Sequence, residues 1–189
     1  GRPGVAHAPT QSWLKGTEYI EPMLRRLDAD GVIEYRRTDA MPHASMPAFL
    51  DGADIVLDQF LLGSYGVAAC EALAAGRLVM GHVDDATRER VREATGFDIP
   101  VHEATVESLE AELRRASADP AAFDAVRAAG PSFVDAVHDG SYDDFKNESD
   151  SLPGVNADDE AKAEACFTWA STECADSLGV PTDIPTDSG

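Results

Sequence analysis

Residues 54–76 read DIVLDQFLLGSYGVAACEALAAG, and this stretch decides the fold of the chain. It predicts a short apolar strand at 54–58, a loop with two glycines, and a helix from about 64 to 75. An open α/β sheet binds its ligands at such junctions between a strand end and a helix start. The helix start presents unpaired backbone N–H groups and partial positive charge, so an anion such as a phosphate fits there.

The sequence on both sides continues the alternation of strands and helices as far as residue 139. Apolar runs predict strands at 4–8, 32–37, 77–83 and 97–102. Helical spacing of apolar residues predicts helices at 17–29, 46–53 and 106–116. We also expect the charged segment at 85–95 to be helical and two more helical turns within 120–139, whereas residues 10–16 read as a loop. We therefore expect residues 1–139 to form a doubly wound, mostly parallel, Rossmann-like α/β domain with right-handed crossovers.

The composition changes beyond residue 139. Asp, Ser, Gly and Pro dominate both ends of residues 140–189, and lysines are rare among many carboxylates. We expect this segment to be an acidic tail that is helical at about 157–176 and flexible elsewhere.

The formal net charge of −20 limits the partners of this chain. A nucleic-acid-binding surface needs lysines and arginines to neutralise phosphates, so we expect no nucleic-acid partner. No apolar run reaches the roughly 20 residues that a transmembrane helix needs. The three cysteines, Cys70, Cys166 and Cys174, lack the spacing of a zinc site or a disulfide framework. We expect a cytoplasmic protein with no transmembrane segment and no bound metal.

Glu71 is the first candidate for a binding residue. It lies among small residues of the helix at 64–75, which leave room for a ligand. A carboxylate at this place can accept hydrogen bonds from the vicinal hydroxyls of a sugar. An ordinary solvated glutamate fits the same pattern, and the sequence leaves both interpretations open.

The loop at 63–66 and two basic side chains are further candidates. The loop lacks the GxGxxG and GK[ST] patterns, which disfavours a dinucleotide-dependent or kinase-like function. Lys15, one of only three lysines, follows the first strand and could balance a phosphate, although a surface lysine has the same sequence pattern. His7 ends a buried strand, where a histidine is more often a satisfied core residue than a ligand.

Three blocks carry a resemblance to a known family: HAPTQSWLKGTEYI at 7–20, DIVLDQ at 54–59, and GSYGVAACEALAAGRLVMG at 63–81. Together they resemble the C-terminal, nucleotide-sugar-binding half of a GT-B glycosyltransferase of the family 4 type, over residues 4–138. The resemblance implies a nucleotide diphosphate sugar as co-substrate and no other cofactor.

The resemblance also implies roles for individual residues. Lys15 would neutralise the donor diphosphate, and Glu71 would hold the ribose hydroxyls. The loop residues Gly63, Ser64, Tyr65 and Gly66 would meet the diphosphate and sugar through their backbone. The turn after Arg37 would lie against the nucleobase. Further candidates around the donor are His7, Gly16, Arg37 and Thr38.

The chain departs from the family pattern at two positions. The family often has a second glutamate at the position of Gly63, and an arginine near residues 11–12, where this chain has Gln11 and Ser12. The chain starts almost directly with a strand, so we expect a fragment that lacks its N-terminal acceptor-binding domain and is inactive alone. A non-catalytic Rossmann-like interaction module and a sugar-nucleotide epimerase remain as alternatives.

Overall fold

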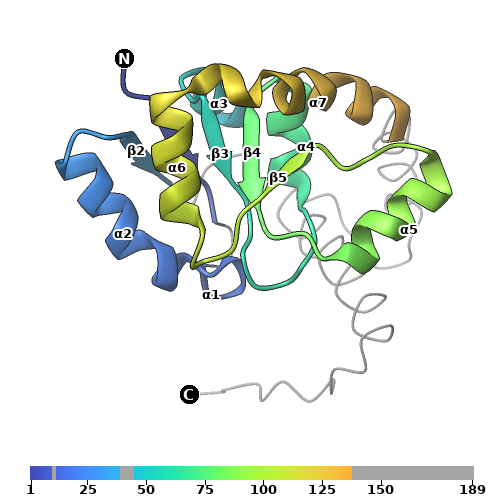
Figure 1. Ribbon diagram of the computed structural model, residues 1–189, viewed down its shortest axis with the longest axis horizontal. Coiled ribbons are helices and arrows are strands. Elements are labelled where there is room, and N and C mark those ends of the chain that lie inside the picture. The colour runs from blue at the N-terminus through green and yellow to red at the C-terminus, as the bar shows by residue number, and fades with distance from the viewer. Residues whose placement is uncertain (10–11, 39–44, 138–189) are drawn as a thin grey trace, which may run out of the picture. The chain divides into compact units, whose positions relative to one another are not determined.

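The computed structural model describes residues 1–9, 12–38 and 45–137, which form an α/β domain around one parallel sheet (Figure 1). The strands run in the spatial order β2-β1-β3-β4-β5. Their bounds are Gly4–His7 (β1), Glu34–Arg37 (β2), Ile55–Leu57 (β3), Leu78–Gly81 (β4) and Val101–Glu103 (β5). The predicted parallel, Rossmann-like α/β sheet is confirmed for this part of the chain.

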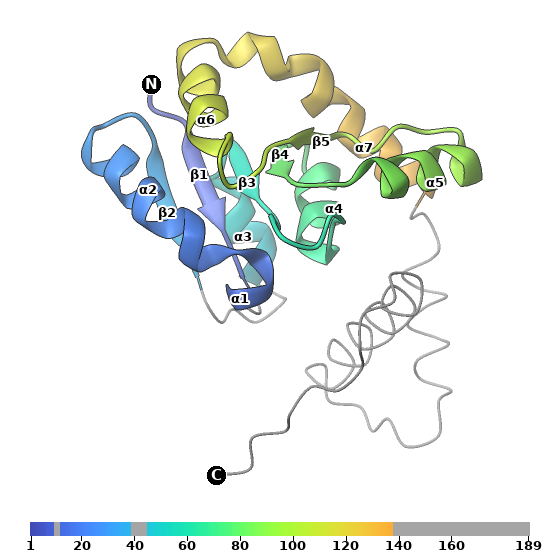
Figure 2. The ribbon, with the colours of Figure 1, turned by 60° about the horizontal axis from the view of Figure 1, so that its bottom comes forward.

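Helices connect the strands and cover the sheet. Their bounds are Ser12–Lys15 (α1), Thr17–Ala29 (α2), Met46–Asp51 (α3), Val67–Ala74 (α4), Asp85–Thr95 (α5), Leu109–Ala118 (α6) and Asp124–Val137 (α7), with a 3-10 turn at Pro120–Phe123 (η2). In both ribbon views α2 and α5 lie near opposite ends of the sheet (Figure 2).

Alternating side chains of the strands build two separate cores. Val5, Ile55 and Leu57 pack with α2 and α6 on one face. Ala6, Val56 and Val79 pack with α3, α4 and α7 on the other face. The central strands are apolar on both faces because helices cover both, which is the usual pattern of a parallel sheet.

The strand order changes direction between β1 and β3. The chain passes from β1 outward to β2 and then returns to β3 on the other side of β1. In open α/β sheets the ligand crevice lies at this switch point, outside the carboxyl ends of the strands. The loops that follow β1 and β3 therefore border the expected crevice.

Several predicted boundaries are wrong. Residues 12–15 form α1 instead of a loop. The helix predicted from 64 starts at Val67, because side chains of the preceding strand end hold residues 64–66. The strand predicted from 97 starts at Val101, just after Pro100, which has no N–H to donate to a ladder. The predicted helix at 157–176 and the rest of the tail lie outside the described residues.

The start of α6 also differs from the prediction. The helix begins at Leu109 rather than at 106. The N–H of Thr105 donates to the Ser108 hydroxyl at 2.9 Å, and the N–H of Ser108 donates to the Thr105 hydroxyl at 3.3 Å. These side chains stabilise a turn before the helix, as hydroxyl side chains commonly do.

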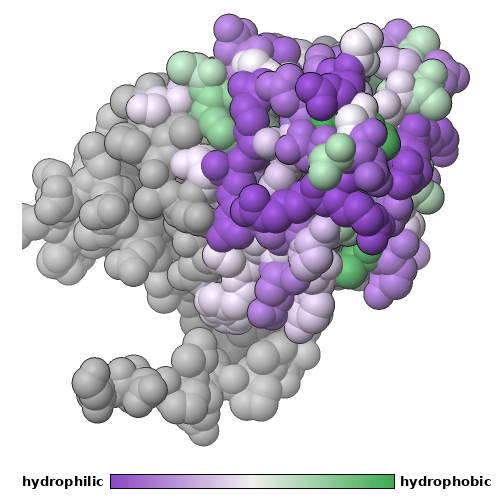
Figure 3. All heavy atoms as spheres, turned by 90° about the vertical axis from the view of Figure 1, so that its left-hand side faces the viewer, coloured by the Kyte–Doolittle hydropathy of each residue, from purple (hydrophilic) through white to green (hydrophobic). Residues whose placement is uncertain are grey.

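The surface on the α2 side is mostly hydrophilic, with few apolar residues (Figure 3). Among the described helices, none combines the length and apolarity needed to cross a bilayer.

Gly130 sets the distance between α7 and α4. A Cβ on Gly130 would lie only 2.7 Å from the carbonyl oxygen of Leu73 in α4 and 3.2 Å from its Cα. Both atoms belong to the backbone, so they cannot turn aside as a flexible side chain would. The two helices can pack this closely only because residue 130 has no side chain.

We predict that Gly130→Ala destabilises the domain by about 1–3 kcal/mol, the cost typical of overpacking. Helix propensity alone predicts the opposite sign, a gain of about 1 kcal/mol. Urea unfolding followed by circular dichroism measures the difference. Ala128→Gly, at an exposed position of the same helix, is the control and should cost about 1 kcal/mol. A more stable Gly130→Ala variant would contradict the close helix contact.

Candidate functional site

The switch point brings Lys15 to the end of β3. The Lys15 ammonium lies 3.0 Å from Oδ1 of Asp58, the first residue after β3. The side chain of Asp58 is 1% exposed and that of Lys15 is 12% exposed. Buried charges need a partner, and these two side chains supply it for each other.

Asp58 also binds the start of α4. Its second oxygen, Oδ2, accepts a hydrogen bond from the Gly66 N–H at 2.9 Å. One carboxylate thus connects Lys15, at the end of α1, with Gly66, in the loop between β3 and α4. Asp58 was not among the candidate residues predicted from the sequence. The available signal was a carboxylate placed directly after a buried apolar strand and before a glycine-containing loop.

Gln59 fixes the loop between β3 and α4. Its side-chain amide donates to the Ser64 carbonyl at 2.8 Å and to the Ser64 hydroxyl at 3.0 Å. Its backbone carbonyl accepts from the His82 N–H at 2.8 Å. Ser64 is therefore held in place from inside the protein. Gln59, like Asp58, was missed at the level of sequence.

Gly63 has a backbone conformation that other residues rarely adopt. Its φ is 65°, and a Cβ would lie 2.6 Å from Oδ2 of Asp84. Asp84 is fixed there, because its Oδ1 accepts from the Thr87 N–H at the start of α5 and its own N–H donates to the Gly63 carbonyl. A glutamate at position 63 would require both the backbone and Asp84 to move.

Tyr65 and Glu71 lie on the α4 side of the sheet. The Tyr65 ring packs edge-on against Phe133 of α7, with 6.1 Å between ring centroids, and burial raises the pKa of Tyr65 to about 12. Glu71 is in α4 and partly exposed. Burial raises the pKa of its neighbour Cys70 to about 12, and the charges of Asp58 and Glu71 contribute to this shift.

His7 is completely buried and holds the two sides of the switch point together. Its Nδ1 lies 3.0 Å from the Leu57 carbonyl and its Nε2 lies 2.8 Å from the Thr17 hydroxyl. Because a carbonyl only accepts, Nδ1 carries the proton and Nε2 accepts from Thr17. Burial lowers the pKa of His7 to about 4. The side chain is therefore neutral and has no surface for a ligand.

Gly16 and Thr38 take part in the switch-point region through their backbone. Gly16, with a φ of 74°, precedes α2, and the Leu61 side chain lies against it. The Thr38 N–H donates to the His7 carbonyl at 3.2 Å.

Arg37 points away from α4. Its guanidinium lies 2.9 Å from Glu21 of α2 and lines a hollow of about 520 Å³ beside Ser12, Thr17 and Pro22. Arg37 shares its side of the sheet with Tyr35, which packs with the α2 face. Arg37 and Glu71 therefore lie on opposite sides of the sheet, and the turn expected to meet a nucleobase continues into residues that are not described.

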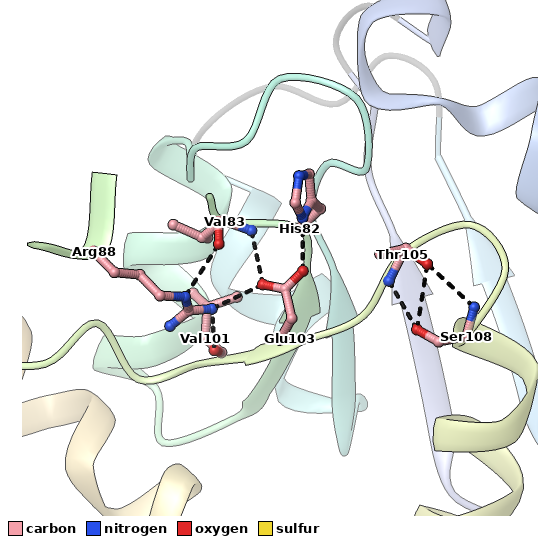
Figure 4. A network of polar contacts seen from close by, with 7 residues as sticks. All are labelled: His82, Val83, Arg88, Val101, Glu103, Thr105 and Ser108. Atoms are coloured by element: carbon pink, nitrogen blue, oxygen red, sulfur yellow. Dashed lines mark hydrogen bonds and ion pairs between the residues drawn. The ribbon is translucent and has the colours of Figure 1, made fainter. Parts of the chain in front are cut away.

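A second polar network lies at the ends of β4 and β5 (Figure 4). The Glu103 carboxylate accepts from the His82 ring at 2.6 Å, the Val83 N–H at 3.0 Å and Arg88 at 3.1 Å. Although partial burial opposes it, these bonds hold the pKa of Glu103 below its usual value. Arg88 also donates to the carbonyls of Ile99 and Val101. The network joins α5 to the edge of the sheet.

No protein-family model matches this chain, and no curated protein matches it significantly. In the described ranges, His, Cys, Asp and Glu side chains nowhere gather in a group of three or more that could hold a metal ion. In the structure Asp58 links Lys15 to the loop at 63–66. Glu71 lies in α4, the helix that follows this loop.

We predict that the neutral state of His7 makes the fold sensitive to acid. The unfolded chain takes up a proton near pH 6.5, whereas the folded chain takes it up only near pH 4. The contribution of His7 to the free energy of unfolding is therefore fully present above pH 6.5. It falls by about 3 kcal/mol as the pH decreases toward 4.

The measurement compares urea unfolding of the wild type and His7→Asn between pH 7.5 and 4.0. Carboxylates titrate in both proteins. The difference between their free energies of unfolding therefore reports on His7 alone. The stability advantage of the wild type should shrink by about 3 kcal/mol over this range. A constant difference would show that His7 is not buried in its neutral form.

Proposed function

We propose that the described domain is the donor-binding domain of a glycosyltransferase that uses a nucleotide diphosphate sugar. One observation carries the proposal. At the β1–β3 switch point, the Asp58 carboxylate contacts both the Lys15 ammonium and the Gly66 N–H at the start of α4. A cation beside a helix N-terminus is a suitable place for phosphate groups.

Each candidate residue has a role in this proposal. Lys15 balances the charge of the diphosphate. Backbone N–H groups of the loop at 63–66 and of the first turn of α4 donate to its oxygens, apart from the Gly66 N–H, which Asp58 holds. Glu71, in the second turn of the same helix, accepts hydrogen bonds from the ribose hydroxyls. During transfer, Lys15 and the N–H groups stabilise the negative charge of the departing nucleotide.

The acceptor is bound by a partner domain in this proposal, since GT-B chemistry takes place between two domains. The nucleotide sugar is the co-substrate, and no other cofactor or metal takes part. The described domain alone then binds a donor weakly and transfers little or no sugar.

A second candidate function is a non-catalytic Rossmann-like module. Asp58 favours it, because this carboxylate already balances the charge of Lys15 and occupies the Gly66 N–H. Gly63, beside the fixed carboxylate of Asp84, favours it as well. Such a module would show no affinity for nucleotide sugars.

We predict that UDP-sugars or GDP-sugars bind the wild-type chain in calorimetric titrations, in the micromolar to millimolar range. Lys15→Met and Glu71→Ala should each weaken binding about tenfold or more, equivalent to the loss of one charged hydrogen bond. Glu89→Ala, on the exposed side of α5, is the control and should bind as the wild type does.

The outcomes separate the two candidate functions. Absence of binding at millimolar donor favours the non-catalytic module. Equal donor affinity of the wild type and Glu71→Ala would show that Glu71 does not contact the donor. The role of Lys15 is tested separately by Lys15→Met.

A further inference from the structure

We propose that Asp58 is a positioning residue that fixes Lys15 and the start of α4 in the arrangement in which they bind a ligand's phosphate groups. This inference rests on the proposed function, because it assigns Asp58 to the same phosphate site. It differs from a simple charge balance, in which Asp58 only reduces the positive charge that a ligand meets.

The surroundings of Asp58 keep its carboxylate in one place. Its side chain is 1% exposed, and its N–H donates to the Met80 carbonyl of β4 at 3.1 Å. Gly81 leaves little free space, because a Cβ there would lie 3.0 Å from the Gln59 carbonyl and 3.7 Å from the Asp58 Cβ. The backbone of Asp58 is therefore anchored to the sheet, and its buried carboxylate is held by Lys15 and the Gly66 N–H.

Lys15 depends on Asp58 for its orientation. A lysine ammonium has three N–H donors on a flexible stem. Among the described residues, Asp58 is the side chain that its ammonium contacts, at 3.0 Å, which leaves donors for a ligand. The backbone supports the same arrangement, because the Lys15 carbonyl accepts from the Phe60 N–H at 3.3 Å. The end of α1 is thus attached to the loop after β3 through both the side chain and the backbone of Lys15.

The two explanations of Asp58 predict opposite results. If Asp58 only balances charge, its neutralisation removes a repulsive carboxylate and strengthens anion binding. If Asp58 positions Lys15, neutralisation releases the ammonium and weakens binding, because a preorganised donor becomes mobile. Asparagine keeps an oxygen that can accept from the Gly66 N–H, so Asp58→Asn tests the contact with Lys15 specifically.

Calorimetry first measures the affinity of the wild type for UDP, GDP and ADP. The variants are then titrated with the nucleotide that the wild type binds most tightly. We expect Asp58→Asn to weaken binding at least tenfold. In a Lys15→Met background the same substitution should change affinity less than twofold, because Asp58 acts through Lys15. Asp58→Asn binding equal to or tighter than that of the wild type would overturn the proposal.

Asp58→Glu keeps the experiment decisive if Asp58→Asn fails to fold. It preserves the charge but displaces the carboxylate by one methylene group. Positioning predicts at least a fivefold loss of affinity, whereas charge balance predicts no change. The circular dichroism of each variant confirms that it is folded.

A readout without nucleotide separates this inference from the proposed function. In NMR spectra the Lys15 ammonium protons should exchange slowly with water in the wild type and rapidly in Asp58→Asn. Slow exchange with no nucleotide binding would reject the phosphate site itself and with it the role of Asp58 there. Rapid exchange in the wild type would show that Lys15 is not held, and would overturn the positioning role directly.

Discussion

The need to keep a buried carboxylate paired governs the edge of the sheet at the β1–β3 switch point. Asp58 lies at the end of a central strand with almost no exposed surface, so both oxygens require donors from the protein. Lys15 and Gly66 supply them, one from each side of the switch point. The course of both loops and the starting point of α4 follow from these two contacts.

The sequence predicted the sheet and its helices well, because that information is local. Apolar runs at β1, β3 and β4 identify strands that are buried on both faces, and regular spacing of apolar residues identifies α2 and α6. The errors lie where tertiary contacts override the local pattern. α4 starts late because Gln59 and Asp58 hold the residues before it, and β5 is shortened at Pro100.

The candidate site was only partly visible in the sequence, because its connections join distant residues. Lys15 and the loop at 63–66 were identified, but the residue that links them was not, since it pairs with a lysine 43 positions away. Gly63 looked like the loss of a side chain. In the fold its backbone angle and the adjacent Asp84 exclude a side chain, a constraint that no local pattern reveals.

The network around Arg88 has a consequence for the surface of the domain. The Ala104 N–H bonds to Gly81 of β4, so the alternate carbonyls of Ile99 and Val101 face outward from the edge strand. Arg88 occupies both of these carbonyls with its guanidinium. Exposed strand edges invite pairing with other chains, and a charged group seated on the edge prevents it. At the β5 edge, the Arg88 guanidinium is therefore a charged group of the kind that discourages pairing with other chains.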